Sequence, residues 1–194
     1  MKNTKEKILQ KSLDLFVKKG FSGSSIRDIA KEVGIRESGI YNHFSSKKEI
    51  LAAIINKLTP ESVAKIILTD ELLDKIGNPE IFLRDFARSI FKFWQTENEQ
   101  SLIKLILSEQ FHNIGEVEIA LNSYYEEYFN ITKMIFSELI KHKLFKKGNA
   151  EIYADNFLGY LFLLRLKNLD TMSDNKLSKK IDDYTKFFWE SVKK

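Results

Sequence analysis

Cysteine is absent from the 194-residue sequence, and proline and glycine are scarce, with two prolines and eight glycines. Without cysteine there are no disulfides, thiolate zinc sites or cysteine nucleophiles, and three histidines too far apart to share a helix face leave little for a metal. Few glycines and prolines argue against a loop-rich β-sandwich, collagen or disorder. With 43% hydrophobic and 30% charged residues, the composition favours a globular, all-α protein, for which we expect no cofactor and no metal.

Long uncharged runs are also missing from the chain. The longest, residues 38–46 and 156–164, have nine residues, whereas a bilayer crossing needs about 20 apolar positions. The N-terminal residues are charged and lead straight into a helical pattern, without the apolar stretch and small-residue cleavage site of a signal peptide. We therefore expect a cytoplasmic protein that does not contact a membrane.

Positive charge is concentrated at one end of the chain. Residues 1–57 contain 12 Lys and Arg against 6 Asp and Glu, whereas residues 58–194 contain 19 against 21. A basic module joined to a neutral body is typical of polyanion-binding proteins, because phosphate neutralisation supplies most sequence-independent affinity for nucleic acid. A lysine-rich solvated surface would give the same counts, so charge alone leaves both interpretations open.

Capping signals divide the first 58 residues into four short helices. Apolar residues recur at the 3.6-residue helical period over 5–19. Ser25 and Asp28 form the capping box of a second helix, and Ser46 and Glu49 form that of a fourth, which carries a wide apolar stripe.

The third helix, predicted at about 36–44, has little apolar surface. It follows a turn at Gly34, and its only apolar residues are Ile40, Tyr41 and Phe44. Two short helices around a glycine-containing turn, the second mostly polar, are typical of a helix-turn-helix, whose second helix lies in the major groove of DNA. A simple helical hairpin remains the alternative. The polar or small residues that suit groove reading are Arg36, Glu37, Ser38, Gly39, Asn42 and His43.

The pattern Tyr-x-His-Phe at 41–44 is followed at a short distance by a Ser-Lys helix start at 46–47. With this specific pattern, about 50 residues of the region resemble the DNA-binding domain of TetR-family transcriptional regulators. The sequence departs from the family at Arg36, where a Ser or Thr N-cap is usual, and at Gly39, where Ser or Thr often contacts phosphate. The other segments that carry the resemblance are Gly20-Phe21, Ser24 to Ala30, Val33-Gly34-Ile35 and Gly39 to Leu51.

The resemblance implies roles for individual residues at the DNA. Tyr41 and His43 are expected to contact or orient backbone phosphates, and Lys47 at the start of the fourth helix is expected to hold another phosphate. Both residues could instead have a structural role. Tyr41 could mainly pack against its own domain, and the imidazole of His43 could be hydrogen-bonded within the chain. The candidates for base readout are Arg36, Glu37, Ser38, Gly39 and Asn42, with Arg able to read guanine, Asn adenine and Glu cytosine. Ser25, Arg27 and Lys48 complete the predicted DNA-binding set.

The chain beyond residue 60 reads as helical throughout. Asn or Thr before Pro at 59–60 and 78–79 predicts helix starts, giving helices at about 60–69 and 79–96. Further helices are expected at about 99–113, 117–145, 150–169 and 175–193, for about nine helices in total. We predict a DNA-binding domain at 1–46 and an effector-binding and dimerisation domain at 47–194, with the helix at 47–58 as connector.

Two C-terminal helices are the expected dimer interface. The run from Phe157 to Leu164 is apolar almost all round, so it needs cover on every side. Burying one face in the subunit and another against a second copy would give a two-fold four-helix bundle. The alternative is that both helices lie wholly in the core of one chain. The predicted interface residues are Tyr160, Leu161, Leu164, Leu177, Ile181, Tyr184 and Phe188.

Aromatic residues concentrate in the middle helices, where they line either an effector chamber or a plain core. Chambers between helices are typically apolar with a few polar anchors. The predicted effector-binding residues are Phe91, Trp94, Phe111, Tyr124, Tyr125, Tyr128, Phe129 and Phe162.

These patterns together predict a homodimeric transcriptional regulator, most simply a repressor that leaves a near-palindromic operator when a small hydrophobic effector binds. No nucleophile beside a base, metal set or phosphate-cradling loop is evident, so we do not expect an enzyme. The alternatives are an all-helical dimeric adaptor without an effector and an uncharacterised helical enzyme.

Overall fold

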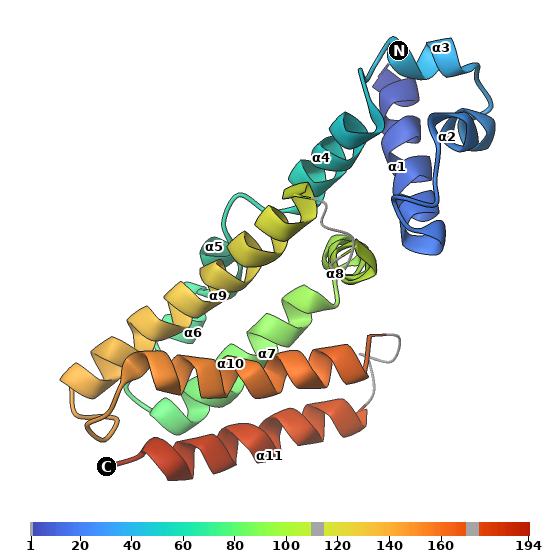
Figure 1. Cartoon of the computed structure of the whole chain (residues 1–194). Helices are drawn as coiled ribbons and strands as arrows, with labels where there is room; N and C mark the ends of the chain where they lie inside the picture. Colours follow the sequence, from blue (N-terminus) through green and yellow to red (C-terminus); the bar gives the residue numbers. More distant parts are fainter. Residues whose placement is uncertain (1, 110–114, 170–174) are drawn as a thin grey trace. The chain divides into compact units, whose positions relative to one another are not determined.

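A computed structural model describes the backbone of residues 2–109, 115–169 and 175–194 (Figure 1). Eleven helices and no named strand occupy these ranges, in agreement with the all-α class and with more helices than the nine or so predicted. In the same ranges no helix is both long enough and apolar enough to cross a bilayer. The helices are α1 Lys2–Lys19, α2 Ile26–Val33, α3 Glu37–Tyr41, α4 Lys47–Leu58, α5 Val63–Ile67, α6 Asp70–Leu73, α7 Pro79–Trp94, α8 Glu97–Glu109, α9 Gly115–Lys141, α10 Ala150–Lys167 and α11 Asn175–Val192.

The helices form two compact units. The first contains Met1–Pro60 and Glu97–Ser123, and the second contains Glu61–Thr96 and Tyr124–Lys194. The first unit therefore holds α1 to α4, α8 and the start of α9, and the second holds the remaining helices. The domain division predicted from the sequence, at residue 46, stays a prediction.

The first unit begins and ends its helices largely where the capping signals predict. The Ser25 side chain accepts from the Asp28 N–H, and Asp28 accepts from the Ser25 N–H, so the predicted capping box is confirmed. At α4, Ser46 caps Glu49 as expected, but the Glu49 carboxylate accepts from the N–H and hydroxyl of Ser45 instead. These bonds lower the pKa of both carboxyls, Asp28 and Glu49.

At the beginning of the second unit, the helix start predicted from Thr59 and Pro60 was wrong. A helix was expected from Pro60, but the Thr59 N–H bonds to the Ile55 carbonyl and so completes α4. The next helix begins only at Val63, where the side chain of Ser62 provides the cap. The same signal at Asn78 and Pro79 is confirmed at the start of α7.

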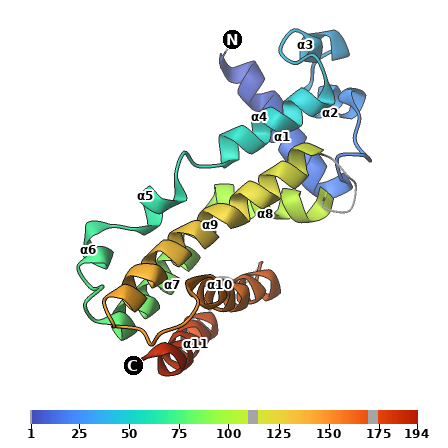
Figure 2. The ribbon, with the colours of Figure 1, turned by 60° about the vertical axis from the view of Figure 1, so that its left-hand side comes forward.

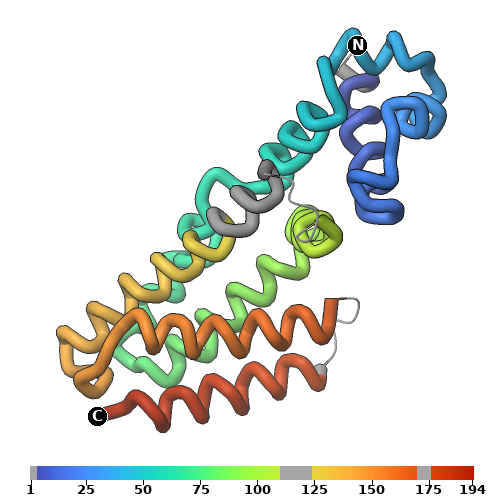
Figure 3. The backbone as a smooth tube through the Cα atoms, viewed as in Figure 1, coloured from blue at the N-terminus to red at the C-terminus, as the bar shows by residue number. Residues whose placement is uncertain are grey.

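The core of the second unit is a stack of aromatic rings between α7, α9, α10 and α11. Helices α10 and α11 run side by side, with α7 next to them (Figures 1 and 2). The ring of Phe157 lies at the centre, 5.9 Å from Phe86, 5.4 Å from Phe136 and 5.1 Å from Phe188. Burying rings of this size is the main source of stability in such a core. The tube view shows the antiparallel course of α10 and α11 clearly (Figure 3).

Candidate nucleic-acid interface

The helix α3 is held by one apolar residue. The backbone turns at Gly34, which has φ +80°, and the N–H groups of Gly34 and Ile35 both bond to the Ala30 carbonyl at the end of α2. Glycine is suited to this left-handed conformation because it has no Cβ. Ile40 is then fully buried, so the rest of the short helix faces outward.

The structure leaves the predicted DNA-binding residues at the surface. None of the eleven is buried, and only Gly39, His43 and Lys47 are half-buried. A Cβ added at Gly39 would lie 3.2 Å from Cδ1 of Ile35, so a larger residue here would require a small shift of the Ile35 side chain. Arg36 occupies the N-cap of α3 without a side-chain cap bond, so its guanidinium is not used to start the helix. The exposed members are Ser25, Arg27, Arg36, Glu37, Ser38, Tyr41, Asn42 and Lys48.

Lys47 has partners within the chain. Its Nζ donates to the carbonyls of Phe21 and Ser24, both at 2.6 Å, and lies 4.1 Å from the centre of the Phe21 ring. Burial lowers the pKa of Lys47, while the charges of Glu109 and Asp28 raise it. Its expected contact with a DNA phosphate stays a prediction, whereas its role in fixing the turn between α1 and α2 is visible.

Sequence reasoning missed Glu109, the last residue of α8. Its Oε1 accepts a 2.5 Å hydrogen bond from the N–H of Phe21, and both residues are buried. A signal was available, because Glu109 continues the stripe of Leu102, Leu105 and Ile106, which are all buried. A carboxylate on the apolar face of a helix needs a partner there.

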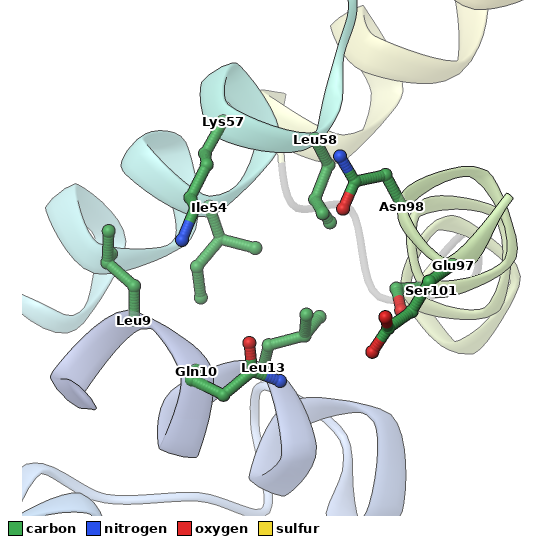
Figure 4. Close-up of a pocket in the computed structure, with 9 residues that line it drawn as sticks. All are labelled: Leu9, Gln10, Leu13, Ile54, Lys57, Leu58, Glu97, Asn98 and Ser101. Carbon is green, nitrogen blue, oxygen red and sulfur yellow. The ribbon is translucent and has the colours of Figure 1, made fainter. Parts of the chain in front are cut away.

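A small pocket of about 50 Å³ lies between α1, α4 and α8 in the first unit (Figure 4). Four apolar and five polar side chains line it, and the close-up shows Leu13, Ile54 and Leu58 pointing into the space between the helices. This volume is a third of the roughly 150 Å³ known to hold benzene, so the pocket as it stands suits only a few atoms. Its residues are Leu9, Gln10, Leu13, Ile54, Lys57, Leu58, Glu97, Asn98 and Ser101, none of which was predicted to bind an effector.

The predicted effector residues meet in the second unit as an aromatic core. Trp94 Nε1 donates to the Tyr128 hydroxyl at 2.9 Å, and the hydroxyls of Tyr124 and Tyr128 lie 3.2 Å apart. The Phe162 ring lies 4.8 Å from Trp94. Phe91, Trp94, Tyr124 and Tyr128 are buried, Tyr125, Phe129 and Phe162 are half-buried, and Phe111 lies outside the described residues.

Arg165 is a polar member of this core that the sequence did not single out. It is fully buried, donates to the Tyr124 hydroxyl, and has its guanidinium carbon 4.7 Å from the centre of the Trp94 ring. Nearby, Tyr125 donates to Asp155 at 2.7 Å, and burial together with this bond raises the pKa of Tyr125 to about 12. The core therefore combines aromatic faces with a cation and several hydroxyls.

Most of the predicted dimer residues lie in the core of their own chain. Leu161, Leu164, Leu177, Ile181 and Phe188 are buried. Tyr160 is exposed and stacks at 4.1 Å on half-buried Tyr184, whose hydroxyl donates to the Asn156 carbonyl and whose pKa is raised by burial. The exposed apolar residues of α10 and α11 are instead Ile152, Tyr160, Leu163, Leu166 and Phe187, which we call the outer face.

Comparison with known proteins finds a sequence family that matches part of the first unit. Residues 8–54 match the family described as bacterial regulatory proteins, tetR family. The uncharacterized HTH-type transcriptional regulator YerO of Bacillus subtilis (strain 168) is 30% identical over 146 residues, which are 74% of this chain. The chain spans about half the length of that relative, 46%.

Two solved structures extend the similarity to the whole chain. NalD, the secondary repressor of the MexAB-OprM multidrug efflux pump in Pseudomonas aeruginosa, has a TM-score of 0.74 at 16% identity and covers 100% of this chain and 98% of its own. AibR, solved in complex with isovaleryl coenzyme A and operator DNA, has a TM-score of 0.65 at 21% identity, covering 93% and 95%. At these identities the two structures establish the fold of the chain.

Proposed function

Because this chain belongs to the tetR family of bacterial regulatory proteins, we propose that it is a sequence-specific DNA-binding transcriptional repressor. The observation that carries the proposal is α3, which is anchored by buried Ile40 and turns its polar residues outward. A helix of this kind can enter the major groove while its own domain stays packed. Regulators of this family are generally not enzymes, and we propose the same for this chain. A cytoplasmic location stays a prediction.

Base readout is assigned to the exposed edge of α3. Arg36 is the candidate for a bidentate contact to guanine and Asn42 for one to adenine, while Glu37 can accept from cytosine. Ser38 and Gly39 line the same edge and allow close approach of the backbone. These residues would decide which sequence is bound.

Phosphate contacts are assigned to the flanks of α3. Tyr41, His43 and Lys48 flank it on the C-terminal side, and Ser25 and Arg27 lie at the start of α2. Contacts to phosphate fix the register of a protein on duplex DNA without reading its sequence. The ammonium group of Lys47 has three N–H donors, and two of them bond to the carbonyls of Phe21 and Ser24. The predicted phosphate contact of Lys47 would use the third.

We further propose a homodimer that pairs through the outer face. The two adjacent helices carry exposed apolar residues, and a two-fold interface would bury these residues against their own copies. The dimer would present two copies of α3 to a near-palindromic operator, with half-sites about 34 Å apart.

The effector is assigned to the aromatic core of the second unit. The buried rings favour a small hydrophobic compound. AibR, which shares the fold, was solved with isovaleryl coenzyme A and operator DNA, so the fold can hold an effector and DNA. Effector binding is expected to change DNA affinity by about 5–150-fold, which is typical of such couplings.

The DNA assignment is tested by comparing two alanine variants on duplexes that the protein selects from a random-sequence library. Asn42→Ala should relax the preference at one base pair by about 1–3 kcal/mol, because it removes a base contact. Lys48→Ala should weaken all sequences alike and reduce the slope of log affinity against log salt by about one, because it removes a phosphate contact. Gel shifts across salt concentrations measure both effects.

Lys65→Ala is the matched control, since Lys65 is an exposed lysine of α5 outside the first unit. It should leave the affinity and the salt slope unchanged. If Lys48→Ala changes base preference and Asn42→Ala does not, the two roles are exchanged. An adaptor or an enzyme would select no duplex at micromolar concentration.

A further inference from the structure

The backbone of one residue of the first unit, Phe21, is held on both sides by charged side chains. The N–H of Phe21 donates to Glu109 Oε1 at 2.5 Å, and the carbonyl of Phe21 accepts from Lys47 Nζ at 2.6 Å. Glu109 belongs to α8 and Lys47 to the first turn of α4, so Phe21 joins two helices that are distant in sequence. Hydrogen bonds to ionised groups are about twice as strong as neutral ones.

The local chain is shaped to admit this carboxylate. Gly20 has φ +77°, and a Cβ added there would lie 3.3 Å from Glu109 Oε1, closer than most real contacts of this kind. Glu109 itself is only 1% exposed. A buried carboxylate is unfavourable unless it is hydrogen-bonded and near a positive charge, and both conditions are met by Phe21 and Lys47.

The position of Phe21 gives the bond a consequence for α2 and α3. Phe21 lies in the turn between α1 and α2, and the next carbonyl that Lys47 holds, that of Ser24, directly precedes the N-cap of α2. Helix α2 begins directly after this turn and α3 follows α2 across Gly34, so the turn sets where both helices start. At the other end of α8, Glu97, Asn98 and Ser101 border the small pocket, so the buried bond lies at the opposite end of the helix from that gap.

We infer that Glu109 is a positioning residue for DNA binding, which holds the turn at Phe21 so that α3 is presented at the correct angle. This inference rests on the proposed function, because it assigns an orienting role behind the same DNA-binding surface. Glu109 is buried, so it would act on DNA binding without contacting the DNA itself.

The test is Glu109→Gln, which keeps the size and an acceptor oxygen but removes the charge. Its affinity for the duplex that the wild-type chain selects should fall about tenfold, within the range of couplings between separate sites. The salt slope should stay at the wild-type value, because no phosphate contact is lost. Glu97→Gln, the same change at an exposed position of α8, should leave affinity and slope unaltered.

Circular dichroism and urea unfolding separate this role from a purely structural one. If folded Glu109→Gln binds the duplex as tightly as the wild type, the inference is overturned, whereas the proposed function stands because the wild type binds. If the wild type selects no duplex, the proposed function fails first.

A measurement on the wild-type chain covers the case in which the variant does not fold. Hydrogen exchange of the Phe21 amide should be strongly protected in the DNA complex, since its N–H is bonded to Glu109. Exchange at the rate of an unprotected amide in the complex would overturn the inference.

Discussion

Leu163→Asp should convert the protein from a dimer to a monomer and lower its affinity for a palindromic operator by about a hundredfold or more, because two linked reading helices bind far more tightly than one. Leu163 is 45% exposed on α10, and Phe187 on α11 is 70% exposed. In a two-fold interface each substitution is present twice, so a single aspartate places two charges in the apolar contact. Sedimentation and gel shift measure the two effects.

Met134→Asp is the control for this prediction. Met134 lies on α9 in the same unit, is 57% exposed and is outside the outer face. The variant should stay dimeric and bind DNA as the wild type does. If Leu163→Asp remains dimeric while its helix content is unchanged, the interface lies elsewhere and the outer face is not the dimer contact.

Local signals predicted the helices well where side chain and backbone agree. The Ser25 capping box and the glycine at 34 fix both ends of α2, and Asn78 with Pro79 fixes the start of α7. Thr59 with Pro60 carries the same signal but failed, since Thr59 is the C-cap of α4 and the next helix begins only at Val63, where Ser62 is the N-cap. A capping pattern therefore marks a possible helix start, and the local sequence alone does not tell which of two such patterns is used.

The exposure of α3 was predictable from its own composition, whereas the contacts that support it were not. One apolar residue, Ile40, is enough to tell which side of a short helix is buried. The bond between Glu109 and Phe21 joins residues 88 positions apart, and periodicity carries no information on which helices become neighbours. An apolar stripe likewise does not say whether it faces its own chain or a second copy, so the predicted dimer residues Leu161 and Phe188 lie in the core.

The sequence predicted the aromatic rings of the core, but it did not predict that the buried Arg165 lies among them. Arg165 is followed and preceded by leucines, and nothing in that context distinguishes a buried arginine from one that reaches solvent. Its guanidinium lies over the Trp94 ring, an arrangement that stabilises a cation away from water. Trp94 therefore contributes both to the packing of the core and to the placement of the Arg165 guanidinium.

Trp94→Ala should lower the free energy of unfolding by about 3–5 kcal/mol, since it empties the space of a fully buried indole. It also removes the donor to Tyr128 and the ring beneath Arg165. If the aromatic core can hold a guest, added indole should refill the cavity and restore part of the loss, about 2.7 kcal/mol at a hundred times its dissociation constant. Urea unfolding with and without indole measures both changes.

Trp189→Ala makes the same substitution at the other tryptophan, which is half-buried on α11, and should cost less and show no response to indole. A large loss at Trp94 that indole does not repair would identify the cluster as plain core and remove it as the effector site. Repair by indole, followed by a change in DNA affinity of the same variant, would instead connect occupancy of the core with operator binding. The two outcomes separate a packing role from a regulatory one at a single residue.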